Sequence, residues 1–408
     1  MQMIPSRPPP PGERGLVAWA RRNLFSGPVN GVTSVVVGTL VLLAAWNLLG
    51  WVTGGASWQP LWNNLKLLAV YRYPADLLWR PVLAAGTLLM LTGLSAGLAR
   101  HAGKGRIIGG VYWWFTGLAL ALTAIAIPFW ESVRVAWVAA SLLALGGYAA
   151  GRLAPGLVRI QTWAWAVGLP AAVVLVYGLG GDGPMEVVRT VEWGGFLLTL
   201  VLASVGITVA FPLGILLALG RQSRLPAIKG FSIGYIELIR GAPLITWLFI
   251  ASLMVPLLLD VSPDSIPALT RAMVAVTLFA SAYMAENVRG GLQSIPNGQR
   301  EAARALGLSG WQTTRLIVLP QALRAVIPAI VGQAIGLFKD TSLVFIVGLF
   351  DFFEIGRRVI PSQPESLLYP GGVLLEISLF MAVVYWFFTY RMSIASRQLE
   401  KELGVGER

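Results

Sequence analysis

The segment EAARALGLSGWQTTRLIVLPQ, residues Glu301 to Gln321, interrupts a chain that is otherwise written in long runs of Leu, Val, Ala, Trp and Gly. It follows the turn residues 296–298 (Pro-Asn-Gly) and offers Ala, Arg, Glu and Leu, which favour a helix. Glu301 near the start of this helix is favoured by the helix dipole. The flanking runs are long enough to cross a membrane, so we expect this polar segment outside the hydrocarbon layer.

The second half of the segment predicts another short helix. Gly307 comes after two helical turns and is a typical helix stop. Ser309 and Gln312 have the spacing of a capping box, which opens a helix. Pro320 is expected to end or kink that helix where the next apolar run begins. The pattern therefore predicts two short helices joined by a glycine bend, which present Ala302, Ala303, Leu306 and Leu308 to a partner or to lipid headgroups.

The composition places the whole chain in a membrane. Of its 408 residues 56% are hydrophobic and 12% are charged, whereas soluble domains are about 25% charged. The apolar runs are continuous and far longer than a barrel strand of about ten alternating residues. We expect an all-α, polytopic helical bundle of about ten spans. Windows of about 19 residues lie near 31–53, 82–99, 107–129, 134–151, 162–180, 195–219, 236–257, 267–288, 322–349 and 372–390.

The basic residues predict the topology. If ten spans alternate and both termini are cytoplasmic, the inner segments hold 21 of the 31 Lys and Arg residues and the outer segments hold seven. This bias agrees with the positive-inside rule, so the net charge of +12 indicates topology and no nucleic-acid partner. Residues 1–30 are Pro-rich and basic and are expected to form a cytoplasmic tail. The polar segment 296–320 then lies in the cytoplasm, between the eighth and ninth spans.

Several classes of activity lack their residues. The chain has no cysteine, and its one histidine, His101, lies among basic residues of a predicted loop, so no metal site is expected. GLGGDG at residues 178–183 fits a dinucleotide pattern by letter but follows a membrane span, so we interpret it as a turn. No phosphate-binding loop or catalytic constellation is present. The chain is therefore predicted not to be an enzyme and to bind no cofactor itself.

The chain divides near residues 181–194, where Gly, Pro and charged residues interrupt the apolar sequence. Residues 31–185 form an N-terminal extension of about five spans, and residues 192–400 form a second set of five. Nearly all charges inside predicted spans lie in the second set. Because such charges are costly in lipid, they usually face a partner or a cavity.

Glu237 and Arg240 are three residues apart on one helical face and are predicted to form a structural ion pair. Direct contact with substrate is the alternative. Gly241 and Pro243 follow and are expected to interrupt the helix. On the next span Glu286 belongs to a polar stripe with Tyr283 and Asn287, and it is assigned either to the substrate pathway or to a bridge with Arg289 or a partner helix.

Lys339, Asp340, Thr341 and Ser342 are consecutive and lie deep in the ninth predicted span. Successive helical residues point about 100° apart, so these four cannot share one partner, and a cavity or a locally unwound stretch would satisfy them. A cation, an anion and two hydroxyls suit the charged groups of an amino acid. The alternative is a Lys–Asp pair that holds two helices together.

The segment also carries a recognisable signature. Glu301-Ala302-Ala303, three residues, Gly307, nine residues, Ile317, one residue, Leu319-Pro320 resembles the cytoplasmic "EAA" motif of permease subunits of ATP-driven importers. The stretches FPLGILLALGR, IELIRGAPLITWLF, SAYMAENVRGGLQSIPNGQREAARALG and GLFKDTSLV resemble the polar amino-acid branch of that family. The likeness covers about residues 192–400. The enlarged first half is similar to broad-range L-amino acid or glutamate/glutamine/aspartate/asparagine permeases.

The resemblance implies a transport function and a set of partners. The chain would be the permease subunit of a binding-protein-dependent amino-acid importer in the bacterial inner membrane. A dimer of cytoplasmic ATPase subunits would hold ATP and Mg, a second permease would pair with this one, and a periplasmic binding protein would deliver the amino acid. The residues implied in ATPase coupling are Glu301, Ala302, Ala303, Gly307, Leu308, Ile317, Leu319 and Pro320. A self-sufficient secondary amino-acid transporter and a membrane enzyme acting on lipid-linked substrates are the competing hypotheses.

Overall fold

The computed structural model describes residues 15–101, 112–113, 116–117, 133–181, 183–262, 265–369 and 372–402. Over these residues the chain is helical, with one isolated β-bridge between Gly195 and Asp351. Contacts between Cα atoms divide it into two compact units, residues 1–59 and 60–408. The predicted class, an all-helical membrane bundle, is confirmed.

The first unit contains a single long apolar helix. α1 (Leu16–Asn23) precedes α2 (Pro28–Gly50), which continues as the wider turn η2 (Trp51–Gly55). Pro28 stands at the first turn, where its missing N–H leaves no hydrogen bond unmade. None of the side chains of α2 is buried by protein. A helix that is apolar on all sides and has no side chain buried by protein suits a lipid environment.

The second unit begins with the N-terminal extension. Its helices are α3 (Gln59–Asn63), α4 (Leu65–Val70), η3 (Ala75–Leu77), α5 (Trp79–His101), α7 (Arg134–Leu153), η5 (Pro155–Arg159), α8 (Gln161–Tyr177) and η6 (Thr190–Glu192). α5 packs against both α7 and α8. Glycines let α5 and α7 approach closely, because a Cβ added at Gly147 would lie 2.2 Å from the carbonyl oxygen of Met90.

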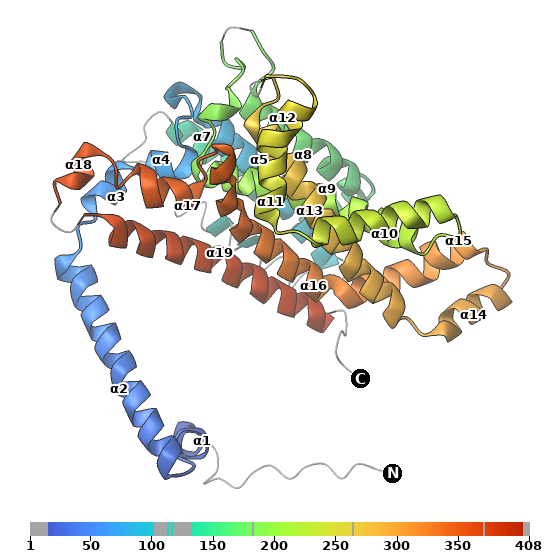
Figure 1. The fold of residues 1–408 in the computed structure, drawn as a ribbon, viewed down its shortest axis with the longest axis horizontal. Helices are drawn as coiled ribbons and strands as arrows, with labels where there is room; N and C mark the ends of the chain where they lie inside the picture. The colour runs from blue at the N-terminus through green and yellow to red at the C-terminus, as the bar shows by residue number, and fades with distance from the viewer. Residues whose placement is uncertain are drawn as a thin grey trace. The chain divides into compact units, whose positions relative to one another are not determined.

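The remaining helices form the C-terminal set. They are α9 (Gly195–Arg221), α10 (Pro226–Arg240), α11 (Leu244–Phe249), η7 (Ile250–Met254), α12 (Val255–Leu258), α13 (Ala268–Ser294), α14 (Asn297–Ala305), α15 (Gly310–Gln312), η8 (Thr313–Val318), α16 (Leu319–Asp340), η9 (Thr341–Val347), α17 (Phe352–Glu354), η10 (Ile355–Val359), α18 (Pro364–Leu367) and α19 (Leu374–Glu402). α13 is central, since it contacts α9, α10, α11 and α16 (Figure 1). α16 also contacts α19, and the main buried core lies around α9 and α13.

The spans agree with the sequence in most places. Among the described residues, seven helices are long and apolar enough to cross a membrane, and α8 is a shorter apolar helix at the predicted span 162–180. The predicted span 236–257 is broken, as expected, because α10 and the helix from Leu244 to Leu258 meet at an angle of 102°. Gly241 and Pro243 cause this break, as expected from the missing proline N–H. The predicted span 107–129 lies almost wholly outside the described residues.

The extension and the C-terminal set pack together in the second unit. α4 contacts α9. Within the extension itself, the hydroxyl of Tyr73 donates a hydrogen bond to the carbonyl of Val176 at 2.7 Å. The buried guanidinium of Arg80 donates to the carbonyls of Pro184 and Glu186 at 2.8 and 2.7 Å. Residues near the predicted boundary at 181–194 are therefore held by the extension.

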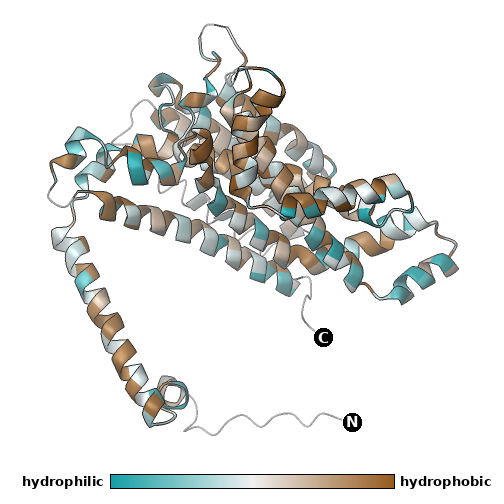
Figure 2. Ribbon diagram, in the orientation of Figure 1, coloured by the Kyte–Doolittle hydropathy of each residue, from teal (hydrophilic) through white to brown (hydrophobic). Residues whose placement is uncertain are grey.

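Two polar segments lie at opposite ends of the second unit. α14 and α15 project at one end, and α17 and α18 lie at the other (Figure 1). Figure 2 shows α14 as hydrophilic, in contrast to the apolar helices α11 and α12. We refer to residues 296–320 as the projecting segment.

Candidate functional site: a projecting segment, an ion cluster and a cavity

The projecting segment contains the predicted glycine bend. α14 ends at Ala305, and Gly307 has a φ of 77°, in the left-handed region that favours glycine. The N–H of Leu308 donates to the carbonyl of Ala303 at 3.1 Å, and the N–H of Gly307 donates to Arg304 at 2.9 Å. These two bonds form a Schellman motif, which satisfies the last carbonyls of the helix. The first helix and its glycine stop are confirmed.

The second helix begins as predicted and ends differently. The Oγ of Ser309 accepts from the N–H of Gln312 at 3.2 Å, and Oε1 of Gln312 accepts from the N–H of Ser309 at 2.9 Å, so the capping box is present. Pro320 does not end the helix, because a single helical run continues from Gly310 to Val347. The wide turns of η8 precede Pro320, and they relieve the clash between its ring and the preceding turn.

The exposed surface of the segment corrects the predicted set of contact residues. Glu301 and Ala302 are exposed, whereas Ala303 is 3% exposed and faces the interior, where α14 contacts η8. Ala303 therefore cannot present its side chain to a partner, and instead its side chain is packed inside the projecting segment. Glu301 is the fifth residue of α14, beyond the first turn, so the helix dipole does not stabilise it as expected. Leu306 is 82% exposed, as the sequence predicted, and Trp311, which sequence reasoning passed over, is 63% exposed.

The other predicted coupling residues lie at the bend of the projecting segment and where the segment joins α16. Gly307 is exposed at the bend, and Leu308 is half-buried beside it. Ile317 and Leu319 are half-buried where η8 enters α16, and Pro320 is exposed. The segment thus offers a bent polar surface with an apolar tip.

Five charged residues from three helices gather where α9, α10 and α13 end. The predicted direct pair of Glu237 with Arg240 is replaced by other partners. Glu237 contacts Arg221 at 2.9 Å, because its side chain faces α9. Arg240 contacts Glu286 of α13 at 3.6 Å, and Arg289 also pairs with Glu286. We refer to these five residues as the ion cluster.

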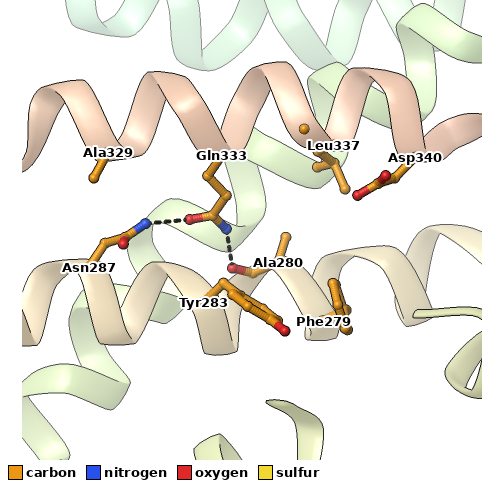
Figure 3. Close-up of a pocket in the computed structure, with 9 residues that line it drawn as sticks. Phe279, Ala280, Tyr283, Asn287, Ala329, Gln333, Leu337 and Asp340 are labelled. Atoms are coloured by element: carbon orange, nitrogen blue, oxygen red, sulfur yellow. Dashed lines mark hydrogen bonds between the residues drawn. The ribbon is translucent and has the colours of Figure 1, made fainter. Parts of the chain in front are cut away.

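A cavity of about 440 Å³ lies between α13 and α16. Figure 3 shows Gln333 reaching from α16 toward α13, where its Oε1 accepts from Nδ2 of Asn287 at 2.8 Å and its Nε2 donates to the carbonyl of Ala280 at 2.6 Å. The carboxylate of Asp340 lines the cavity at the end of α16, and Tyr283 lines it from α13. The wall is completed by the apolar or small residues Phe279, Ala329, Gly336 and Leu337.

The structure separates the residues predicted for a substrate pathway. Asp340 lines the cavity, but Glu286 belongs to the ion cluster and is held by arginines. Lys339 is exposed, and Ser342 is half-buried outside the cavity lining. Thr341 is fully buried, and its hydroxyl donates to the carbonyl of Phe338 at 2.9 Å.

The backbone does change at residues 339–342, but it tightens and does not form the unwound stretch given as one expectation. α16 ends at Asp340 and the tighter helix η9 begins at Thr341. This change rotates the following side chains away from the cavity, so the four polar residues do not share one environment. Only the carboxylate at the junction, that of Asp340, is left facing the cavity.

Sequence reasoning missed Gln333 as a cavity residue. A signal was present, because Ala329, Gln333, Gly336 and Asp340 are spaced by four, three and four residues and so share one helical face. Asn287 was assigned to a polar stripe, and it does line the cavity. A search for polar residues at helical spacing from Asp340 would have found Gln333.

Two buried carboxylates mark the other end of the second unit. Asp351 caps α17, where its Oδ1 accepts from the N–H of Glu354 at 3.0 Å. Glu354 is buried and pairs with Arg357 and Arg358, each at 2.9 Å. Burial raises the pKa of Asp351 to about 6, and the hydrogen bond from Glu354 opposes that rise.

Smaller predictions can be placed as well. Residues 178–181 and 183 lie outside the helices, with left-handed glycines at 178, 180, 181 and 183, as expected of a turn. Among the residues that the structure describes, no group of three or more His, Cys, Asp or Glu is arranged to hold a metal ion. The side chain of His101 lies outside the described residues.

Comparison with known proteins decides the family. The model of the family described as "Binding-protein-dependent transport system inner membrane component" matches residues 210–404. The chain is 39% identical to the inner membrane amino-acid ABC transporter permease protein YhdY of Escherichia coli K12, over 99% of this chain and 98% of that protein. The chain belongs to this family of ABC transporter permeases. The permease is also 36% identical to the glutamate/glutamine/aspartate/asparagine transport system permease protein BztC of Rhodobacter capsulatus, over 98% and 97% of the two chains.

A solved structure is similar over about half of the chain. The crystal structure of an amino acid ABC transporter with histidines matches 51% of the permease and 92% of that chain, with 29% identity and a TM-score of 0.45. Family membership makes the permease a multi-pass inner-membrane transport subunit and not an enzyme, as the sequence predicted. ATP hydrolysis belongs to a separate subunit of such importers, and a binding protein supplies the substrate. The self-sufficient secondary transporter is therefore not favoured.

Proposed function

We propose that this permease conducts amino acids through the inner membrane and that the cavity between α13 and α16 lies on their path. The carrying observation is the similarity over nearly the whole chain to permeases named for amino-acid transport. The cavity adds chemical support, because it combines one carboxylate with fixed amide groups and an aromatic wall. A site of this size and polarity suits a small zwitterion.

Asp340 is the residue that we assign to substrate recognition. The residue is half-buried and lines the cavity, and its carboxylate makes no hydrogen bond or ion pair within the described part of the chain. A carboxylate withdrawn from water normally has a cationic or hydrogen-bonding partner. The ammonium group of an amino acid would supply that partner. Asn287 and Gln333 would orient the substrate through amide groups that are already held in place by hydrogen bonds.

The projecting segment is the element that we assign to the ATPase. It presents the exposed residues Glu301 and Ala302 on α14, and Leu306 just beyond the end of that helix. The Schellman motif fixes the direction of α14 relative to the rest of the segment. Contacts that differ between two ATPase states can then shift the equilibrium between two states of the permease. We further propose that ATP and Mg bind on a dimer of ATPase subunits in the cytoplasm. Both termini of the permease are proposed to lie on the cytoplasmic side as well.

The proposal also includes the outer side and the oligomer. A periplasmic amino-acid-binding protein would dock near α17 and α18, which lie at the end of the second unit opposite the projecting segment (Figure 1). A second permease with a similar C-terminal core would complete the translocation path. Whether that second subunit is a copy of this chain or a related chain is decided by co-purification.

The test is reconstitution of the complete transporter in proteoliposomes. With ATPase, binding protein and ATP present, uptake of radiolabelled amino acids is expected, and a competition series over the twenty amino acids defines the range. Omission of ATP or of the ATPase subunit is expected to abolish uptake. Uptake by the permease alone on an ion gradient, at the rate of the complete transporter, would refute the proposal.

A further inference from the structure

Glu286 is a shared anion for three arginines that come from three helices. Arg221 is the last residue of α9, Arg240 is the last residue of α10, and Arg289 lies one turn beyond Glu286 on α13. The carboxylate Oε2 of Glu286 lies 3.8 Å from Arg221 and 3.6 Å from Arg240. One side chain of α13 therefore ties down the ends of both neighbouring helices.

The links between helices differ in kind from the link within α13. Oε1 of Glu286 accepts hydrogen bonds from Arg289 on the same helix. Oε2 makes no hydrogen bond, so Arg221 and Arg240 are attracted to it by charge alone. Ion pairs without a hydrogen bond are weaker than charge-assisted hydrogen bonds and can separate and re-form more easily. The two links between helices are the separable ones.

The ion cluster contacts the wall of the cavity. The guanidinium of Arg240 lies 5.4 Å from the centre of the Tyr283 ring, in a cation–π contact, and Tyr283 lines the cavity. Asn287, the residue after Glu286, lines the same cavity. A displacement of Arg240 would therefore leave Tyr283 without its support.

The same helix ends are joined to the projecting segment by an apolar cluster. This cluster contains Ala218 of α9, Ile236 of α10, Val288 of α13 and Val318 of η8, all fully buried. Val318 is the last residue of η8, where the projecting segment enters α16. A push on the projecting segment thus reaches the helices that the ion cluster holds, because close-packed side chains transmit displacement.

α10 has a natural pivot next to the cluster. The chain turns by 102° between α10 and the following helix, at Gly241 and Pro243. Pro243 has no N–H to donate, so the break carries fewer backbone hydrogen bonds than a continuous helix. Hinges of moving helices are commonly located at such element ends.

We infer that Glu286 is a positioning residue that holds α9 and α10 against α13 and so closes the cavity on the side of the projecting segment. Release of Arg221 and Arg240 from Glu286 opens that side of the cavity during transport. This inference rests on the proposed function, because it assigns Glu286 a part in the same transport cycle. It replaces the expectation that Glu286 itself binds substrate.

The experiment measures access to the cavity from the cytoplasm. The permease has no cysteine, so Ala280→Cys, at a buried position of the cavity wall, gives this subunit a single thiol that only an opened cavity exposes. The complete transporter in inside-out vesicles is labelled with a membrane-impermeant maleimide, without substrate. In the Glu286→Gln variant we expect labelling to be about tenfold faster, the factor that corresponds to a loss of about 1.4 kcal/mol of closed-state stability. Glu186→Gln removes an exposed carboxylate of the loop before η6 and is the matched control, with labelling at the parental rate.

A double-mutant cycle separates this role from general support of the fold. Arg240→Gln removes one partner and is expected to speed labelling, and the double variant with Glu286→Gln is expected to be no faster than Glu286→Gln alone, since both changes release the same contact. Labelling of the single variants at the parental rate, or strictly additive effects, overturns the inference. If Glu286→Gln does not assemble, Arg240→Gln alone decides by the same measurement. No substrate is used in this assay, so a negative labelling result leaves the proposed amino-acid uptake standing. Loss of uptake together with the expected labelling rates would count only against the proposed amino-acid uptake.

Discussion

Replacement of Gly307 by alanine tests whether the bend in the projecting segment is what an ATPase subunit binds. Gly307 has a φ of 77°, and a Cβ at this position would meet no atom within 4 Å. The cost of the substitution is therefore that of placing an L-residue in the left-handed conformation, about 1–2 kcal/mol. A penalty of that size lowers the population of the bent form about fivefold to thirtyfold. We expect a matching loss in affinity for the ATPase and in ATP-driven uptake.

The assay compares Gly307→Ala with Gly310→Ala. Gly310 also has open space around its Cβ position, but it is the first residue of α15 and has no left-handed φ. Binding of the purified ATPase subunit to detergent-solubilised permease is measured for both variants, together with uptake in proteoliposomes. Gly307→Asn should recover part of the binding, since asparagine tolerates the left-handed region. Equal binding of the Gly307→Ala and Gly310→Ala variants would refute the reasoning.

Three further variants test other parts of the molecule. Glu301→Lys reverses an exposed charge on α14, so uptake and ATPase binding should fall at least about tenfold while membrane insertion, measured by yield in the membrane fraction, stays unchanged. Asp340→Asn removes the one carboxylate among the described residues that line the cavity, so competition assays should show weakened substrate affinity or an altered range, and unchanged kinetics for every amino acid would return Asp340 to a structural role. For Asp351, whose pKa of about 6 in the folded protein exceeds the ordinary value of 3.8, the folded state prefers the neutral acid, and this contribution to stability is complete below about pH 4 and is lost as pH rises through 6. Asp351→Asn should therefore raise the melting temperature at pH 8 more than at pH 5, as measured by thermal unfolding in detergent, and an equal shift at both values would contradict the assignment.

Local features of the projecting segment could be predicted because they depend on neighbours in sequence. The capping box of Ser309 and Gln312 and the stop at Gly307 need only a few residues of context, and both are present. The continuation of the helix through Pro320 could not be predicted. It depends on the wide turns of η8, and those become stable only where Val318 is buried against other helices.

The candidate site divides in the same way. Asp340 was identified from the cost of a carboxylate inside an apolar run, and the structure places it in a cavity wall. Gln333 was passed over, because its role depends on the carbonyl of Ala280 on another helix. Glu237 and Arg240 were paired by their spacing, but the packing of α9 and α13 beside them supplied nearer partners.

The sequence by itself determined that this protein is a helical membrane protein with a bent polar segment between two spans, since apolar run length, charge bias and helix-stop residues act over short distances along the chain. The resemblance to importer permeases came from the spacing of residues 301–320. Only the tertiary structure decided which charges meet, which face of α14 is buried, and where a cavity opens between α13 and α16. Those outcomes follow from which helices pack side by side. A charge in a helix takes the partner nearest in space, and that partner can lie dozens of residues away, as Glu286 does from Arg240.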